Sequence, residues 1–264
     1  MASIDSTQVD ALRESNPELQ YEIVDTAGFT YYMVNQDPAD TELFTDVRVR
    51  QALHYALDRD TYAETIENGY AIRADGTQPV LSPAYAPDRM NTVYTYDPEQ
   101  AASLLEEAGW IVGGDGIREK DGVRFSFECL YPEGAGSLDQ GIPFLQQHWR
   151  EVGVEMLPTA VPFPTLLERI DTFQFEMAVL GFSWGFDGLQ SVMFRCDMVP
   201  YNGFNNMKYC NERYDELDTA ARRELDPGKR RDLMIEAANI VNDEMAIGVL
   251  VFANAIYGAS PRVH

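Results

Sequence analysis

The hydrophobic positions of this sequence recur with two different periods, one typical of β-strands and one typical of α-helices. In the first, apolar side chains alternate with polar ones or form short runs rich in Val, Ile, Phe and Tyr, which is typical of β-strands. A turn signal at Ala27-Gly28 separates the first two of these runs, so we expect a hairpin there. The segments expected as strands are residues 19–24, 29–35, 123–130, 154–160, 175–180 and 247–256, with a brief strand between two turns in residues 113–122.

The second period places apolar residues three and four positions apart and predicts amphipathic helices. Asp46 precedes one such stretch, and Asp97-Pro98 opens another. An aspartate before a helix caps its free N–H groups, and proline suits the first helical position. The expected helices are residues 47–57, 61–67, 98–108, 138–152, 164–170, 211–224 and 227–244.

Strands and helices alternate through much of the chain, after the hairpin expected near its start. This order predicts an α/β fold with a mixed sheet. Residues 78–90 hold three prolines and are expected to form an extended loop.

Composition narrows the classes of function. The chain has 264 residues, of which 45% are hydrophobic, and 20 Lys and Arg against 43 Asp and Glu give a net charge of −23. The apolar content suffices for a packed core, while the charge argues against binding to nucleic acid or an anionic membrane surface. Lysine occurs at three positions only, which fits either a salt-adapted surface or a biased genome. We see no signal peptide and no run of about 20 apolar residues.

Three cysteines are present. Cys129 lies in an alternating segment and is expected to be a small core residue. Cys196 and Cys210 flank a loop rich in Pro, Asn and Gly, at a spacing typical of neither zinc nor redox motifs. These two residues form either a disulfide, if the protein is extracytoplasmic, or a pair of free thiols.

One segment resembles a catalytic motif. Residues 181–185, Gly-Phe-Ser-Trp-Gly, match the GxSxG nucleophile elbow of serine hydrolases and follow an apolar strand. The motif requires a later histidine, and His264 is the only one after Ser183. His54 and His148 precede the serine, which is the wrong chain order for that fold. We therefore keep a hydrolase using Ser183 only as an alternative and expect no enzymatic activity.

Metal and nucleotide sites have little support. The histidines are scattered, and the sequence contains neither HExxH nor paired CxxC. Asp115 and Asp121 flank a glycine-rich loop that is expected to be a solvated turn, without GxGxxG or Walker spacing. Neither a metal nor a cofactor is expected. The arginines at positions 48, 50 and 59 are expected to pair with the neighbouring aspartates at 46, 58 and 60.

Aromatic residues gather after the strand expected at residues 175–180. One group comprises Phe182, Trp184 and Phe186, and a second, in the following loop, comprises Tyr201, Phe204 and Tyr209 together with Asn202, Asn205 and Asn206. Aromatic faces and amides on loops at strand ends suit recognition of a peptide or a sugar. The alternative interpretation is that half of these aromatic residues belong to the core.

Several segments together resemble a known family. FTDVRVRQALHYALDR at residues 44–59 resembles the F-x-D-x-R-V-R-Q-A-L-x-Y-A-I-D-R signature of extracellular solute-binding proteins for dipeptides, oligopeptides and nickel. YDPEQAASLLEEAGW at 96–110 is similar to the family's Y-D-P-E-K-A-K-x-L-L-x-E-A-G-W. The hairpin DGIREKDG at 115–122 and the late motifs NERYDEL at 211–217 and DPGKR at 226–230 follow in the family's order.

This resemblance implies a fold and a function. It implies that residues 1–264 form a single lobe, the carboxy-terminal ligand-closing domain of a larger two-lobe protein with a type II-like periplasmic-binding fold. The signal sequence, lipoprotein cysteine and first lobe would lie upstream. Such a protein is extracytoplasmic and membrane-anchored, and it delivers a small solute to the permease of an ATP-binding-cassette importer.

The resemblance also implies a site. The expected ligand contacts of this lobe are Phe182, Trp184, Asp187, Tyr201, Asn202 and Phe204. In peptide binders the pattern G-W-x-x-D supplies a Trp that packs on the ligand and an Asp that pairs with its amino terminus. Phe182 and Gly185 stand at those two positions here, and the nearest carboxylate, Asp187, better matches the Asp of the family's following D-P-D. This departure argues against recognition of a free amino terminus and favours an oligosaccharide or another small solute. Related proteins with disulfides in this region make a Cys196–Cys210 bridge the preferred interpretation.

Overall fold

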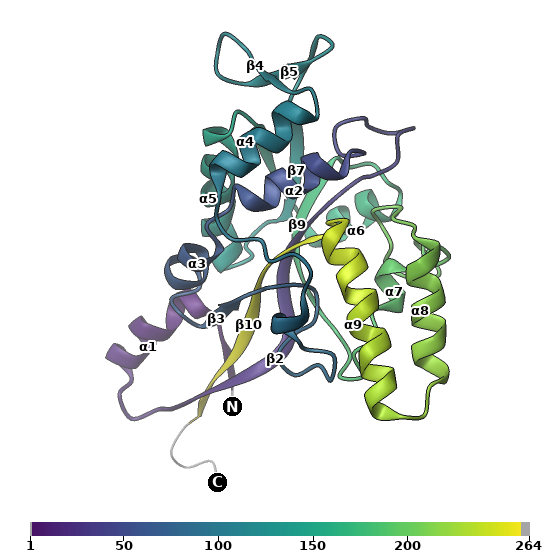
Figure 1. Cartoon of the computed structure of the whole chain (residues 1–264). Helices are drawn as coiled ribbons and strands as arrows, with labels where there is room; N and C mark the ends of the chain where they lie inside the picture. Colours follow the sequence, from purple (N-terminus) through teal and green to yellow (C-terminus); the bar gives the residue numbers. More distant parts are fainter. Residues whose placement is uncertain (1, 260–264) are drawn as a thin grey trace.

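The computed structural model describes residues 2–259, and its centre is a seven-stranded mixed sheet (Figure 1). The strand order is β1-β10-β2-β9-β7-β8, and β3 also pairs with β10. Strand β7 runs parallel to β8 and β9, whereas the remaining pairs are antiparallel. The α/β fold with a mixed sheet is thus confirmed. The strands are β1 (Ala2–Ile4), β2 (Gln20–Val34), β3 (Ala71–Arg73), β7 (Ser126–Pro132), β8 (Glu155–Val161), β9 (Met177–Ser183) and β10 (Gly248–Ala259).

Helices cover both faces of the sheet (Figure 1). One layer contains α2 (Val47–Tyr55), α4 (Pro98–Glu107) and α5 (Ser137–Glu151), and the other contains α6 (Phe163–Asp171), α7 (Ser191–Phe194), α8 (Glu212–Arg223) and α9 (Pro227–Asp243). Side chains of β2 alternate between the layers: Tyr32 packs in the first, and Tyr31 and Met33 pack in the second. The part of β2 from Phe29 to Val34 is largely buried, and its sequence is accordingly apolar except at Thr30.

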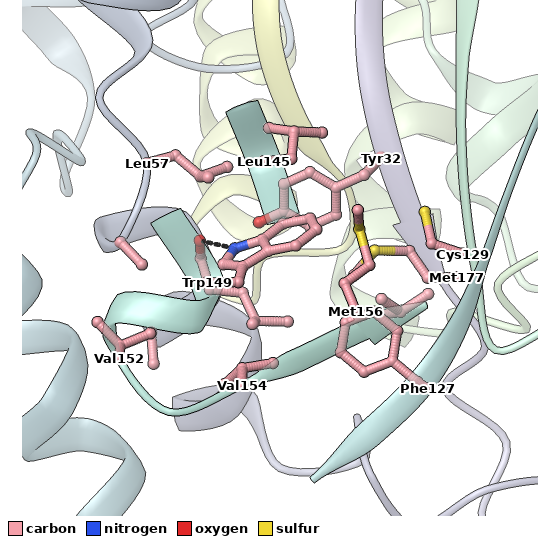
Figure 2. Packing of buried hydrophobic residues seen from close by; sticks show 14 of the residues in the cluster. Tyr32, Leu57, Phe127, Cys129, Leu145, Trp149, Val152, Val154, Met156 and Met177 are labelled. Carbon is pink, nitrogen blue, oxygen red and sulfur yellow. Dashed lines mark hydrogen bonds between the residues drawn. The ribbon is translucent and has the colours of Figure 1, made fainter. Parts of the chain in front are cut away.

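Trp149 occupies the centre of the first core (Figure 2). Its ring meets that of Tyr32 edge to face at a centroid distance of 5.4 Å. Its indole N–H donates to the carbonyl oxygen of Leu53 at 2.8 Å, so the polar edge of this buried side chain is satisfied. Helix α5 is thereby bound both to the sheet and to α2.

The helix starts follow the local sequence signals. The carboxylate of Asp46 accepts from the backbone N–H of Arg48 at 2.9 Å, and Asp97 accepts from that of Gln100 at 2.9 Å. Most expected helices and strands lie within a few residues of their observed bounds. Short elements that the sequence pattern did not predict are β1, β3, α1 (Val9–Ser15) and α7.

Several smaller elements complete the chain. Strands β4 (Ile111–Val112), β5 (Arg118–Lys120) and β6 (Val123–Arg124) form a separate three-stranded sheet that projects at the top of Figure 1. The strand expected at residues 123–130 is therefore divided between two sheets, because β6 pairs with β5 and β7 with β8. The remaining pieces are η1 (Ser6–Gln8), α3 (Arg59–Thr61), the π-turn η2 (Tyr62–Ile66) and η3 (Pro87–Arg89).

The expected hairpin at Ala27-Gly28 is wrong, because β2 is one continuous strand. Its partner β10 follows it from Gln20 to Tyr32, with a register shift at residues 26–28. Thr26 holds this bulge: its hydroxyl donates to the carbonyl of Ala253 at 2.7 Å and accepts from the N–H of Gly28 at 2.9 Å. The glycine thus marks a bulge within a strand and not a turn between two strands.

Strands β2 and β10 continue as a ribbon past the end of β9. Strand β9 pairs with β2 only from Gly28 to Val34, whereas β10 pairs with it from Gln20 onward. The short β1 joins this ribbon, with Ile4 opposite Ile256. The first and last described strands of the chain therefore lie side by side, beyond the end of β9 (Figure 1).

The expectation of local arginine pairing is confirmed for Arg48 and wrong for the other two. Arg48 forms an ion pair with Asp46 at 2.6 Å. Arg50 is buried and donates to the carbonyl oxygens of Phe44, Thr45, Glu244 and Met245. Arg59 is buried and donates to those of Ala74, Tyr94 and Val249. The five donors of a guanidinium suit converging carbonyls that the fold collects from distant segments.

Candidate functional site

The candidate site lies at the end of β9, on the side of the sheet covered by α7 and α8. Phe182, near this end, is partly buried and meets the ring of Phe204 edge to face at 5.4 Å. Phe204 belongs to the following loop and is 51% exposed. The structure therefore brings these two expected ligand contacts together, and we call the pair the aromatic ledge.

Trp184 occupies a different environment from the one expected. It is 5% exposed and stacks on Phe29 with a centroid distance of 5.1 Å. Its indole N–H donates to the carbonyl of Thr77 at 2.9 Å. Because the ring is covered and its polar edge is satisfied, Trp184 is a core residue beneath the ledge, and in this structure it offers no open face to a solute.

Asp187 lies on the exposed part of the loop that follows β9. Its carboxylate accepts from the backbone N–H of Leu189 at 3.1 Å, which forms a tight local turn. The neighbouring Phe186 is 70% exposed. Phe186 belongs to the aromatic pattern in the sequence but is not among the expected ligand contacts.

The second loop is closed by a disulfide between Cys196 and Cys210, whose Cα atoms are 4.5 Å apart. Cys129 is a buried free thiol, as predicted. Tyr201 at the tip of the loop is 94% exposed and has a left-handed φ of 76°. Asn202 is exposed and donates from its amide to the carbonyl of Asp197 at 3.4 Å. Neither Tyr201 nor Asn202 contacts the ledge through any interaction among the described residues.

Buried polar groups fix the loop in place. Asn205 donates to the carbonyls of Arg195 at 3.0 Å and Tyr209 at 2.6 Å, and it accepts from the N–H of Tyr209 at 3.0 Å. At the start of the loop, Arg195 lies 3.4 Å from the buried carboxylate of Asp218 in α8. Burial raises the pKa of the nearby Asp215 carboxyl, which accepts from the N–H of Cys196. The loop is therefore rigidly attached to α8.

The surroundings of Ser183 do not match a nucleophile elbow. Ser183 ends β9 in register with Gly28, and an irregular loop follows it where the elbow needs a helix. His54 is buried among the first-layer helices, where its Nδ1 lies 3.2 Å from the hydroxyl of Tyr32. His148 bonds to the carbonyl of Phe144, and His264 lies outside the described residues.

Within residues 2–259, no group of three or more His, Cys, Asp or Glu side chains is arranged to hold a metal ion. No helix in the same range is long and apolar enough to cross a membrane.

Sequence reasoning missed the support beneath the site. Thr77 and Gln190 are buried and bond to each other, and the Thr77 carbonyl also accepts from Trp184, which lies more than 100 positions away in the sequence. No local motif marks such a contact. The only signal was the proline-rich character of residues 78–90, which indicated a loop but not its partner.

Comparisons with known proteins agree with the sequence motifs. The profile of the bacterial extracellular solute-binding proteins, family 5, middle region, matches residues 1–202. The oligopeptide-binding protein AppA of Bacillus subtilis is 31% identical over 179 residues, covering 67% of this chain and 33% of the relative. The dipeptide-binding protein of Escherichia coli is 28% identical over 220 residues, covering 82% of this chain and 38% of the relative.

Solved structures agree on the fold. The structure of Bacillus subtilis AppA in complex with a nonapeptide has a TM-score of 0.90 at 24% identity and covers 98% of this chain. The Thermus thermophilus oligopeptide-binding protein complexed with a pentapeptide has a TM-score of 0.86 at 22% identity and covers 95%. The chain spans 51% and 46% of those two structures, and about a third of each curated relative named above. The chain belongs to the bacterial extracellular solute-binding proteins of family 5.

Proposed function

We propose that this chain is the ligand-closing lobe of a two-lobe substrate-binding protein and that it helps to hold a peptide for an ATP-binding-cassette importer. The observation that carries the proposal is the aromatic ledge at the end of β9, where the exposed ring of Phe204 meets the partly buried ring of Phe182 beside the disulfide-closed loop. Both peptide-named relatives above support it. A second lobe joined through the ribbon of β1, β2 and β10 would face these loops, because the ribbon extends past the end of β9.

The mechanism is closure of two lobes over a solute. A ligand shifts the balance between open and closed states only through contacts that improve in the closed state. The ledge presents the exposed ring of Phe204 packed against Phe182, and the disulfide and Asn205 order the loop that carries Phe204 before any ligand binds. Little conformational entropy is then lost at this surface when the ligand binds.

A peptide fits the loop better than an oligosaccharide. The sequence comparison placed Phe182 and Gly185 against the Trp and Asp of the peptide pattern G-W-x-x-D. Trp184 and Asp187 have the same W-x-x-D spacing two residues later, and β9 ends at Ser183, directly before them. We assign Asp187 as the carboxylate that meets the amino terminus of a peptide, with Trp184 acting beneath the loop and not on its surface.

Location and partners follow from the same proposal. The complete protein would be extracytoplasmic and anchored to the membrane, and it would release its solute to a permease. The lobe itself needs no cofactor or metal for this role, and it performs no catalysis. Tyr201 and Asn202 belong to the surface that meets the ligand or the other lobe.

Calorimetric titration of the complete protein tests the proposal with three probes: Ala-Phe-Ala, its N-acetylated form and maltotriose. We expect Ala-Phe-Ala to bind more tightly than the other two. Asp187→Asn should weaken its binding about tenfold to a hundredfold, because a charged hydrogen bond contributes about 1.5–3 kcal/mol. The acetylated peptide should bind equally to both forms. Glu99→Gln on α4, an exposed carboxylate in the opposite layer, is the matched control.

A second variant tests the ledge. Phe204→Ala should weaken binding of Ala-Phe-Ala about tenfold, the usual effect of truncating an aromatic contact. Tighter binding of maltotriose than of Ala-Phe-Ala would indicate an oligosaccharide-binding protein in place of a peptide-binding one. The absence of binding by all three probes would contradict the proposed function. Labelling by a fluorophosphonate that is lost in Ser183→Ala would replace it with a serine hydrolase.

A further inference from the structure

A network of buried hydrogen bonds, which we call the knot, anchors the loop from Trp184 to Gln190. The carbonyl oxygen of Thr77 accepts from the Trp184 indole at 2.9 Å and from the Gln190 side-chain amide at 2.7 Å. The hydroxyl of Thr77 donates to the amide oxygen of the same Gln190 at 2.7 Å. All three side chains are buried, so water does not compete for these bonds.

A second bond joins the same two segments. The side-chain amide of Gln78, also buried, donates to the carbonyl of Gly188 at 3.0 Å. Gly188 has a φ of +74°, and a Cβ there would lie 3.0 Å from the hydroxyl oxygen of Ser82. The chain is therefore packed tightly against residues 77–82 at a point where only glycine fits without strain.

Between these attachment points the loop is open. Gly185, Phe186 and Asp187 are exposed, whereas Trp184, Gly188 and Gln190 on either side are buried. The backbone N–H of Trp184 is also held, by the carbonyl of Ala27 at 3.0 Å. The loop thus has two fixed ends and an exposed tip, and the tip carries the carboxylate assigned to the peptide.

We propose that Thr77 and Gln190 are positioning residues for ligand recognition, which act by fixing the tip that carries Phe186 and Asp187. This inference rests on the proposed function, since it names residues that serve the same site without touching the solute. It assigns a role in binding to two buried side chains that lie in separate parts of the sequence.

The orientation of the Gln190 side-chain amide explains how these hydrogen bonds hold the loop in place. The Thr77 hydroxyl holds the Gln190 oxygen on its own side, and this turns the amide N–H₂ toward the Thr77 carbonyl. Without the hydroxyl, the amide oxygen loses its donor and the side chain is free to rotate. A reversed amide would set two oxygens against each other, which would push Thr77 away from Trp184 and loosen the first attachment of the loop.

Two substitutions at one position separate this role from a general effect on stability. Thr77→Val keeps the shape of the side chain and removes the hydroxyl, whereas Thr77→Ser keeps the hydroxyl. Both are made in the complete protein, and hydrogen exchange of the tryptophan indoles is measured without ligand. Trp149 is the internal reference, because its indole is also buried and donates to a carbonyl, that of Leu53, at 2.8 Å.

We expect Thr77→Val to speed exchange at Trp184 at least tenfold while exchange at Trp149 stays unchanged. Titration with Ala-Phe-Ala should show an affinity about tenfold lower. In Thr77→Ser, the exchange rate at Trp184 and the affinity for Ala-Phe-Ala should both stay within about twofold of the wild-type values. If the valine variant does not fold, Gln190→Met repeats the measurement from the other side of the knot.

The outcomes divide clearly. Unchanged exchange at Trp184 in Thr77→Val, or in Gln190→Met if the valine variant does not fold, would overturn the inference, as would faster exchange with an unchanged affinity. Equal acceleration at Trp184 and Trp149 would indicate a loss of global stability and would also overturn it. If the wild-type protein binds no peptide, the proposed peptide-binding function fails, and the positioning role for that ligand fails with it. If the wild-type protein binds the peptide and only the variants depart from the expected results, the positioning role fails and the proposed function stands.

Discussion

Replacing Arg59 by methionine should destabilise the protein more than replacing any exposed arginine. The Arg59 guanidinium is buried and donates to three carbonyl oxygens, those of Ala74, Tyr94 and Val249. These carbonyls belong to the end of β3, the segment before α4 and the start of β10. Methionine keeps the length of the side chain but leaves all three without this donor.

The magnitude follows from two opposing contributions. Hydrogen bonds from a charged donor contribute about 2 kcal/mol each, or roughly 6 kcal/mol for three. Against this, the pKa of Arg59 falls from 12.5 to about 10, chiefly through burial, and this net shift corresponds to roughly 3 kcal/mol against the charged guanidinium, a cost that methionine avoids. The net loss in the free energy of unfolding should be about 3 kcal/mol, or roughly 6–12 °C in melting temperature.

Urea unfolding followed by circular dichroism measures the difference. Arg48→Met is the matched control, because Arg48 is half-exposed and pairs with Asp46 at the surface, where an ion pair contributes less than about 1 kcal/mol. Arg59→Lys should fall between the two, since an ammonium cannot follow the fork of a guanidinium. A loss below about 1 kcal/mol for Arg59→Met would refute the reasoning that these carbonyls depend on the guanidinium.

Three further predictions concern stability. Replacing Cys196 and Cys210 by serine should cost about 3 kcal/mol in urea unfolding, from the loop-closure entropy of a 14-residue separation, and an equal midpoint in wild type and variant would contradict this. Burial holds the pKa of His54 well below 6.5, so the unfolded chain takes up a proton there that the folded chain refuses, and stability falls as pH drops below about 6.5. His54→Gln should reduce the loss between about pH 7.5 and 5.5 relative to wild type, whereas an identical pH dependence would refute the assignment. Because the net charge of −23 makes the folded chain repel itself, about 1 M NaCl should raise the melting temperature in a thermal scan, and a fall would indicate that surface ion pairs dominate.

Helix starts were predictable because the interactions that make them are local. Asp46 and Asp97 lie directly before the N–H groups they cap, so the short-range sequence contains both partners. The bulge at Thr26 was not predictable in the same way. Its partner is Ala253, which is distant in the sequence. The nearby Gly28 is as typical of a turn as of a bulge unless the long pairing of β2 with β10 is known.

The candidate site shows the same division. The sequence identified aromatic residues after β9 and the two cysteines, and the order of its motifs indicated the family. It did not separate Phe204, which is half-exposed, from Trp184, which is covered by Phe29. Burial of an aromatic side chain depends on what packs against it, and here that is a strand more than 150 positions away.

The sequence by itself determined the fold class and the family, and it predicted a candidate site after β9, because periodicity, caps and motif order are properties of neighbouring residues. Tertiary structure alone decided which polar groups are buried and what satisfies them. Arg50 and Arg59 bind carbonyls from distant segments, and Thr77 reaches Gln190 across more than 100 positions. A buried polar group must find a partner, but a linear sequence does not say which distant backbone the fold will bring to it.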